Sequence, residues 1–502
     1  MERFKLIQKQ TTDIVYFGII ARILIFIKGI LIAYQIGSNY NTDIYFLALS
    51  ASLLLTSVIG DGLAVSLIPV LQQVDERDGM KGRLEFTNNT INNSIFFSII
   101  LIIVGFVGAP WIIRLMGPGF KGIEYEQTVR LFRIGLPIIS INFIRAICAG
   151  YLQSQHKFQA GAKGAVVNNL IFILYLTLFS NRFGLEGLMI TGIIAMIGQL
   201  VVFFRAMAKG GYKYSFHFLY QSRTFQRLIS FLIPISLGIG INQINTAVDN
   251  AIGSVLPAGT IASLNYANNI IQLILGLFVL ALVSAIFPVI SESFNRDEQE
   301  ELTGNIKFGL KIVSLIIIPV SIIFIILPEL IVKLVYERGE FSHASTILTS
   351  EILKIYAIGL IGMGLILLII RIYYAVHDTV TPMKIGLIAL PLNVLLSLIF
   401  VQFIGANGLA LGTSISVLIT TIIGIYDLNK NLYIFEYRET GKKIFKIIIS
   451  GLIMSGLVIF IKINIGPILN NSFGEELALF ILAAGVGFSA YWTLLSKFKI
   501  LK

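Results

Sequence analysis

The sequence has few of the residues on which soluble enzymes depend. Charged residues make up 13% of its 502 residues, about half the share typical of a soluble domain. The single cysteine, Cys148, excludes a disulfide within the chain, and the four histidines lack the spacing of a metal site. No glycine-rich nucleotide-binding motif occurs, so direct use of ATP is not expected. We therefore expect neither a metal nor an organic cofactor, and no enzymatic activity.

Hydrophobic residues dominate instead, at 56% of the chain, with a mean hydropathy of +0.86. Windows of about 19 residues predict 14 transmembrane spans, which makes this an all-α polytopic membrane protein. The first span follows a basic segment and is full-length, so we expect a retained helix rather than a signal peptide. The predicted spans are 14–37, 44–71, 93–116, 131–154, 166–181, 185–206, 228–256, 261–290, 310–335, 352–376, 383–404, 407–428, 444–465 and 475–496.

Lysine and arginine residues concentrate in alternate loops, and this pattern predicts the orientation of the chain. The loops rich in lysine and arginine hold clusters such as Arg77, Lys81 and Arg83, whereas the loops on the other side of the membrane hold few cations. Cytoplasmic loops carry the excess of positive charge, so both termini are predicted to be cytoplasmic in a bacterial inner membrane. The net charge of +11 is explained by these loops and does not indicate nucleic acid binding.

Three pairs of similar segments, each six spans apart, indicate an internal repeat. The pairs are LAVSLIPVLQQ at 63–73 with LVSAIFPVISE at 282–292, RAICAGYLQSQHKF from Arg145 with RIYYAVHDTVTP from Arg371, and GLEGL at 184–188 with GANGL at 405–409. An even offset gives two six-helix lobes of equal orientation, related by an axis along the membrane normal. We predict lobes at 1–227 and 228–432, a central cavity between them, and an additional helix pair at 433–502.

The first span contains two cations, Arg22 and Lys28, among apolar residues. A charge at mid-membrane costs at least ~2.5–3.5 kcal/mol and normally faces protein or water. The two residues lie about 120° apart around a helix, so one broad polar face can hold both. We predict that this face lines a cationic cavity. The alternative is that Lys28 snorkels and Arg22 pairs with Asp43 or Asp61.

Further polar residues inside the spans are candidate functional groups. Asp61 is expected either to pair with Arg22 or Lys28 or to carry a proton, and Asp43 is expected at an interface or a lateral gate. Arg145 and Arg371 occupy repeated positions, which favours a structural or gating role at the cytoplasmic mouth over substrate contact. One span carries amides that suit sugar and peptide groups, with interhelical hydrogen bonding as the alternative. These amides are Asn265, Asn268, Asn269 and Gln272.

Several segments together resemble a known transport family. They are GPGF at 117–120, LFRIGLPII at 131–139, NTAVDNAIGSVLPAGTIASLNYAN at 245–268, YERGEFS at 336–342, YYAVHDTVTPMKI at 373–385 and GANGLALGTSIS at 405–416. Because these segments occur in this order, the chain resembles the lipid II flippases of the MurJ (MviN) family, within the multidrug/oligosaccharidyl-lipid/polysaccharide exporter superfamily. The resemblance implies a cationic cavity, a lipid-tail groove on the last two helices, and contacts with cell-wall synthesis proteins.

The resemblance also implies an activity and an energy source. The activity is export of undecaprenyl-diphosphate-linked peptidoglycan precursor by alternating access. Because no ATP-binding motif occurs, the energy is expected to come from an ion gradient (Na⁺ or H⁺) or from the membrane potential. It supports a coupling-cation site at Asp249, Asn393, Ser397 and Thr413, although Ser397 stands where the family has an acid. Asn393 and Ser397 are four residues apart, on one helix face.

The chain departs from the family pattern in its cations, which leaves other functions open. No arginine occurs between Ile44 and Leu71, and VDN at 248–250 and ANN at 267–269 replace arginine-containing versions. A flippase for another polyprenyl-linked glycan, such as an exopolysaccharide, teichuronic-type or O-antigen-like unit, would show this pattern. A cationic-drug antiporter would instead need an acidic, aromatic pocket, and a glycan polymerase would need a large outer loop.

Overall fold

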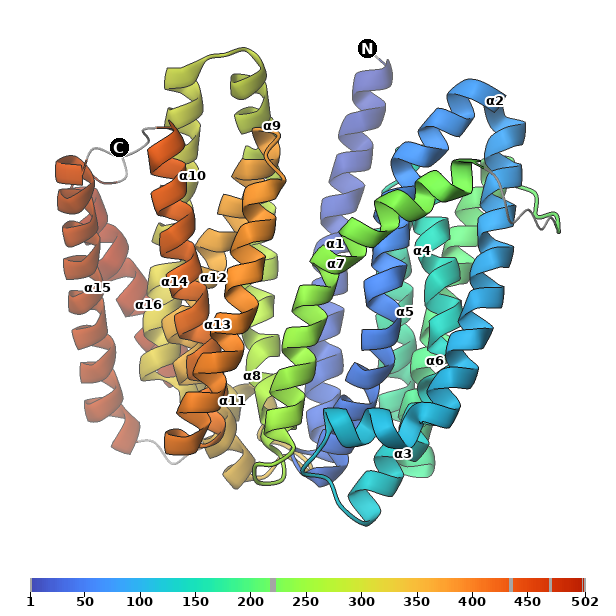
Figure 1. Cartoon of the computed structure of the whole chain (residues 1–502). Coiled ribbons are helices and arrows are strands. Elements are labelled where there is room, and N and C mark those ends of the chain that lie inside the picture. Colours follow the sequence, from blue (N-terminus) through green and yellow to red (C-terminus); the bar gives the residue numbers. More distant parts are fainter. Residues whose placement is uncertain (1, 217–222, 433–436, 469–471, 499, 501–502) are drawn as a thin grey trace. The chain divides into compact units, whose positions relative to one another are not determined.

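The computed structural model describes residues 2–216, 223–432, 437–468, 472–498 and 500, and its described part is helical throughout, without strands (Figure 1). The predicted all-α membrane class is therefore confirmed. The first helices are α1 (Glu2–Ile36), α2 (Tyr40–Met116), α3 (Ile123–Gly135), α4 (Ile138–Ser154), α5 (Gln159–Leu178), α6 (Ser180–Lys209) and α7 (Arg223–Gly253). They are followed by α8 (Thr260–Ile274), α9 (Leu280–Asn295), α10 (Gln299–Ile326), α11 (Pro328–Tyr336), α12 (His343–Ala375), α13 (Val380–Ile404), α14 (Ala406–Leu432), α15 (Tyr437–Ile465) and α16 (Phe473–Lys497).

Among the described residues, 12 helical segments are long and apolar enough to cross a membrane. The predicted count of 14 is not confirmed, for two reasons visible in the chain. The single element α2 contains two of the predicted spans, and α7, which covers the predicted span 228–256 up to Gly253, is not among the 12 segments. The predicted span at 310–335 also breaks at Leu327, where α10 ends and the short α11 begins at Pro328.

The element α2 turns back on itself at Gly79, whose φ of +65° interrupts the helix (Figure 1). Glycine tolerates this left-handed region because it has no Cβ atom. Beyond the turn the chain is helical through the sequence TNNTINNS, at 87–94, most of which lies before the predicted span at 93–116. These polar residues are buried, so this part of α2 belongs to the interior of the unit rather than to a loop.

Asparagines spaced along one face of α2 hold the segment that follows α6. We call Asn88, Asn89, Asn92 and Asn93 the asparagine ladder. Tyr212 donates its hydroxyl hydrogen bond to Asn88 Oδ1, and Tyr214 donates to Asn92 Oδ1 at 2.7 Å. The amide of Asn88 in turn donates to the hydroxyl of Ser215 at 2.9 Å. Side-chain amides thus fasten the segment before residue 217 to α2.

The chain divides into two compact units, 1–262 and 263–502. In the first unit α4 and α7 pack on α2, and α5 packs on both α1 and α6. The predicted lobe boundary at 227–228 follows the sequence repeat, whereas the compact units place α7 with the first lobe. The lobe boundaries and their symmetry relation stay predictions.

In the second unit α14 packs on α12 and α13, and α15 and α16 pack on each other. A Cβ atom added to Gly359 would lie 2.7 Å from Cα of Ser414, so α12 and α14 approach closely there. Between α8 and α9 the residues Leu275–Val279 form a single π-helical turn. Such turns interrupt the regular hydrogen-bond ladder and often occur at functional sites.

Candidate functional site

The two cations of the first span lie on a helix that packs against α5. Lys28 Nζ lies 4.6 Å from the ring centroid of Phe172, and Lys163 Nζ lies 5.0 Å from that of Phe17. Both partner positions increase together along the chain, so α1 and α5 run in the same direction. The two contacts are separated by about 15 Å along the helices, and Arg22 lies between them in height, about 120° around α1 from Lys28. We call Arg22, Lys28 and Lys163 the cation row.

The side chains of the cation row are partly buried, neither sealed inside the unit nor fully exposed. No hydrogen bond or ion pair joins Arg22, Lys28 or Lys163 to any other residue that the structure describes. A ring face attracts an ammonium group but offers no acceptor oxygen. The N–H groups of the row therefore keep their capacity to bind an anion.

The expected ion pairs between these cations and the carboxylates of α2 are absent from the described residues, so that interpretation is wrong. Asp61 Oδ1 instead lies 3.0 Å from Nη2 of Arg145, on α4. Arg145 also donates from Nε to Asn142 Oδ1 at 2.7 Å. A Cβ atom on the neighbouring Gly62 would lie 2.3 Å from Oγ of Ser236, so α7 crosses α2 beside this ion pair.

Arg371 does not repeat this arrangement. Its side chain is exposed, and within the described ranges it forms no ion pair or hydrogen bond. The repeat places Leu280 where the first lobe has Asp61, so the second lobe lacks the carboxylate at that position. The two arginines therefore have different surroundings despite their matching positions, and the gating role predicted for both remains a prediction.

Asp43 is buried and acts as a structural acceptor. Its carboxylate accepts hydrogen bonds from the backbone N–H groups of Gly259, at 2.6 Å, and Ala262, at 2.7 Å. These groups lie at the N-terminus of α8, where unpaired N–H groups favour an anion. On the other side of the same turn, Gly119 donates its N–H to Ser254 Oγ at 3.0 Å. Asp43 thus joins the start of α2 to the turn between α7 and α8, as an interface residue would.

The amides of α8 are arranged for external contact. Asn268 and Gln272 are exposed, and Gln272 Nε2 donates to Asn268 Oδ1 at a long 3.4 Å. Asn265 and Asn269 are partly buried on the same helix. Interhelical hydrogen bonding does not account for the two exposed amides, so sugar or peptide contact stays open for them.

Three of the four predicted cation-coupling residues meet in the second unit. Asn393 Nδ2 donates to Thr413 Oγ1 at 3.0 Å, and Oγ of Ser397 would lie 2.4 Å from a Cβ atom on Gly412. Oδ1 of Asn393 and Oγ of Ser397 are buried without a hydrogen-bond partner. Asp249, on α7 in the first unit, also has a buried oxygen without a partner.

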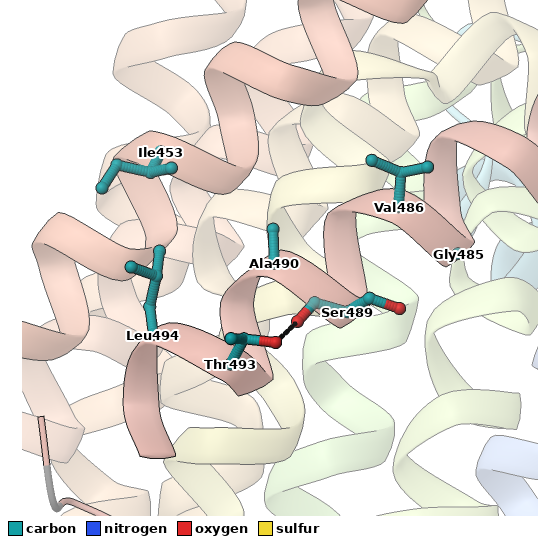
Figure 2. Close-up of a pocket in the computed structure, with 7 residues that line it drawn as sticks. All are labelled: Ile453, Gly485, Val486, Ser489, Ala490, Thr493 and Leu494. Atoms are coloured by element: carbon teal, nitrogen blue, oxygen red, sulfur yellow. Dashed lines mark hydrogen bonds between the residues drawn. The ribbon is translucent and has the colours of Figure 1, made fainter. Parts of the chain in front are cut away.

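The last two helices form a shallow pocket of about 530 Å³. Figure 2 shows its lining residues along α16, from Gly485 to Leu494, together with Ile453 on α15. Thr493 donates its hydroxyl hydrogen bond to the carbonyl oxygen of Ser489 at 2.7 Å, so its polar group is satisfied within the helix. The remaining lining is mostly apolar and suits a hydrocarbon chain.

Sequence reasoning missed Lys163 and the asparagine ladder. Lys163 lies three residues before the predicted span at 166–181, and only its contact with α1 distinguishes it from a loop lysine. The ladder had a signal in its regular spacing of asparagines at i and i+4, which places them on one helix face.

A chain of apolar helices that carries cations, carboxylates and amides within them is a polytopic membrane transporter. The family model described as lipid II flippase MurJ matches residues 32–473, which is most of the chain. The chain therefore belongs to the MurJ family, as the sequence motifs predicted, and is a multi-pass membrane protein of a transport family.

Curated relatives agree with this membership along almost the whole chain. A probable lipid II flippase MurJ from Buchnera aphidicola subsp. Baizongia pistaciae is 24% identical over 95% of this chain and 94% of its own length. The probable lipid II flippase MurJ of Helicobacter pylori (strain ATCC 700392 / 26695) is 27% identical over 80% of this chain and 90% of its own length.

Solved structures show the same fold. A lipid II flippase MurJ in an inward closed conformation has a TM-score of 0.80 at 24% identity, covering 97% of this chain and 100% of its own. An inward-facing multidrug resistance MATE family transporter of the MOP superfamily has a TM-score of 0.70 at 15% identity, covering 82% and 94%. Both structures thus share the fold of this chain.

Proposed function

We propose that this protein is a flippase that moves lipid II, the undecaprenyl-diphosphate-linked peptidoglycan precursor, from the inner to the outer leaflet of the cytoplasmic membrane. Family membership supports the cargo, and both termini are taken to be cytoplasmic. The observation that carries the mechanism is the cation row on α1 and α5, which has no anionic partner among the described residues. Transport changes no covalent bond, so no catalytic group is required.

The row offers what a diphosphate group needs. Charge-assisted hydrogen bonds are roughly twice as strong as neutral ones, and the surrounding apolar helices lower the local dielectric constant. Arg22 can bind two phosphate oxygens with its planar fork, whereas Lys28 and Lys163 act as point charges. The rings of Phe17 and Phe172 hold the two lysines in place. Lys28 and Lys163 give the diphosphate two positions about 15 Å apart along the helix pair, and Arg22 lies between them in height, about 120° around α1 from Lys28.

The remaining parts of the substrate fit other features. The exposed amides Asn268 and Gln272 suit the sugar and peptide of the head group. The pocket between α15 and α16 suits part of the polyprenyl tail, which stays in the hydrocarbon phase while the head moves.

Energy for transport is proposed to come from the membrane potential or from a cation. One elementary charge crossing the membrane is worth about 2.3 kcal/mol per 100 mV. The unpartnered oxygens of Asn393 and Ser397 and the hydroxyl of Thr413 are hard ligands of the kind that Na⁺ prefers.

Complementation of a bacterium depleted of its own lipid II flippase tests the proposal. The wild-type chain is expected to restore growth, whereas Arg22→Ala and Lys28→Ala are expected to fail at equal expression. Lys81→Ala serves as the control, because this lysine is exposed near the turn of α2. If the wild-type chain does not complement, a transport assay in liposomes with other polyprenyl-diphosphate sugars tests the alternative cargo.

A further inference from the structure

A second cavity lies in the first unit, between α7 and the two arms of α2. It has a volume of about 500 Å³, within the ~300–1,000 Å³ typical of small-molecule sites. Phe143 of α4 closes one side, and its ring stacks on that of Phe97 at a centroid distance of 6.4 Å. Leu232 of α7 lines another side. None of the residues of the cation row contributes to this cavity.

Two buried polar atoms in the lining of this cavity have no hydrogen-bond partner. Asn93 is 8% exposed and donates its amide to Asn89 Oδ1 at 3.1 Å, which leaves its own Oδ1 without a donor. Ser236 is also 8% exposed, and its hydroxyl is unpaired. A buried polar group without a partner costs about 1–3 kcal/mol. Ser236 Oγ packs against Gly62 of α2, where an added Cβ atom would lie 2.3 Å away, so Asn93 Oδ1 is the atom that a group in the cavity would satisfy.

The chemistry of Asn93 Oδ1 selects the kind of group, because this acceptor needs a donor. A hydroxyl group provides one donor without carrying a charge, so it can satisfy Asn93 Oδ1. A carboxylate or phosphate would place acceptor atoms against Asn93 Oδ1, and no described cation lines the cavity to compensate its charge.

The rest of the lining indicates that the ligand is mostly apolar and shows where it can enter the cavity. Aromatic and branched aliphatic side chains make up most of the walls. Phe96, Ile100 and Ile233 are lining residues that are also exposed on apolar helices, at 52%, 43% and 57%. The cavity therefore opens at an apolar surface of the first unit, of the kind through which a membrane-dissolved molecule can enter.

We propose that this cavity binds an apolar chain that ends in a hydroxyl group, taken up from the bilayer. The hydroxyl donates to Asn93 Oδ1, and the chain lies against the phenylalanine side chains of the lining. Because α7 supplies one wall and α2 the other, the occupant holds these helices together. The site is separate from the cation row and from the pocket between α15 and α16.

Photolabelling of the full-length protein in lipid nanodiscs tests this proposal. The probe is dodecanol bearing a mid-chain diazirine, and the matched probe is its methyl ether, which has no donor. Mass spectrometry locates the labelled peptides. We expect labelling of the α2 segment around Phe96 and the α7 segment around Leu232, roughly five- to tenfold stronger for the alcohol. Equal labelling by both probes, or labelling confined to other helices, would overturn the proposal.

Two variants sharpen the result. Ile100→Trp fills the mouth of the cavity and is expected to reduce alcohol labelling at least tenfold. Val104→Trp, one turn further along the exposed face, is the control and should label like the wild type. Asn93→Leu should label equally with the two probes. The comparison of the two probes on the wild-type protein needs no substitution, so it decides the question even if a variant does not fold.

Discussion

The carboxylate of Asp61 and the guanidinium of Arg145 form an ion pair between α2 and α4, at 3.0 Å. It lies where α7 crosses α2, because the neighbouring Gly62 leaves room for Ser236. The pair is the feature that most clearly separates the two repeats, since the second has Leu280 in place of the acid. The contribution of this ion pair to the free energy of unfolding can be measured directly.

We expect Asp61→Asn and Arg145→Gln to be coupled. The side chain of Asp61 is 47% exposed and that of Arg145 is 22% exposed, so solvent screening limits the interaction to about 1 kcal/mol. A double-mutant cycle on the free energy of unfolding in detergent measures the coupling. Additive effects of the two substitutions would show that the pair contributes nothing.

Lys163 is expected to contribute to substrate binding as Lys28 does. Lys163→Gln removes one charge of the cation row and should weaken the affinity for a short-chain polyprenyl diphosphate about tenfold, since hydrogen bonds to charged groups contribute ~1.5–3 kcal/mol. Microscale thermophoresis on the purified protein measures this. Lys121→Gln, at an exposed loop position, is the control. An unchanged affinity in Lys163→Gln would remove this residue from the row.

Asp43→Ala is expected to lower the thermal midpoint of unfolding. It leaves the buried N–H groups of Gly259 and Ala262 without an acceptor, at about 1–3 kcal/mol each. Asp43→Asn should have a smaller effect, because one amide oxygen remains. Scanning fluorimetry compares both with Glu126→Ala, an exposed position on α3. A midpoint equal to that of the control would contradict the structural role of Asp43.

Asp378 precedes α13 and lies outside the membrane spans. We expect its contribution to the stability of the fold to depend on pH. Burial opposes ionisation, but hydrogen bonds from Thr381 and from the Val380 N–H outweigh it and lower the pKa of the carboxyl group. Stability from this group is therefore present above the pKa of the unfolded chain and lost as the pH falls through the lower, folded value. Asp378→Ala should cost about 1 kcal/mol at neutral pH.

The matched control for this prediction is Asp378→Asn. Asparagine caps a helix as well as aspartate but does not titrate. The difference in unfolding midpoint between Asp378→Ala and the wild type should shrink in acid, whereas that between Asp378→Ala and Asp378→Asn should stay constant. A wild-type advantage that persists unchanged into strong acid would contradict the assignment.

The sequence predicted the helical class, the family and the polar residues of single helices, because these depend on composition, on motifs and on spacing along one helix. It predicted the wrong partner for Asp61, because Arg145 is 84 positions away and nothing local selects it over Arg22. It also predicted a single span at 310–335, whereas the structure has a helix that ends before Leu327. The sequence also did not reveal the burial of the polar residues 87–92, because two of their asparagines are covered by Tyr212 and Tyr214 of a distant segment.

The hydrogen bonds of Tyr212 and Tyr214 to the asparagine ladder have a mechanical consequence. They anchor the chain just ahead of residue 217, and α7 starts at Arg223. From Phe216 to Arg223 the backbone can reach at most about 25 Å. The start of α7 therefore cannot move far from α2. Any large movement of α7 must come from bending further along the helix, where Pro234 removes a backbone hydrogen bond.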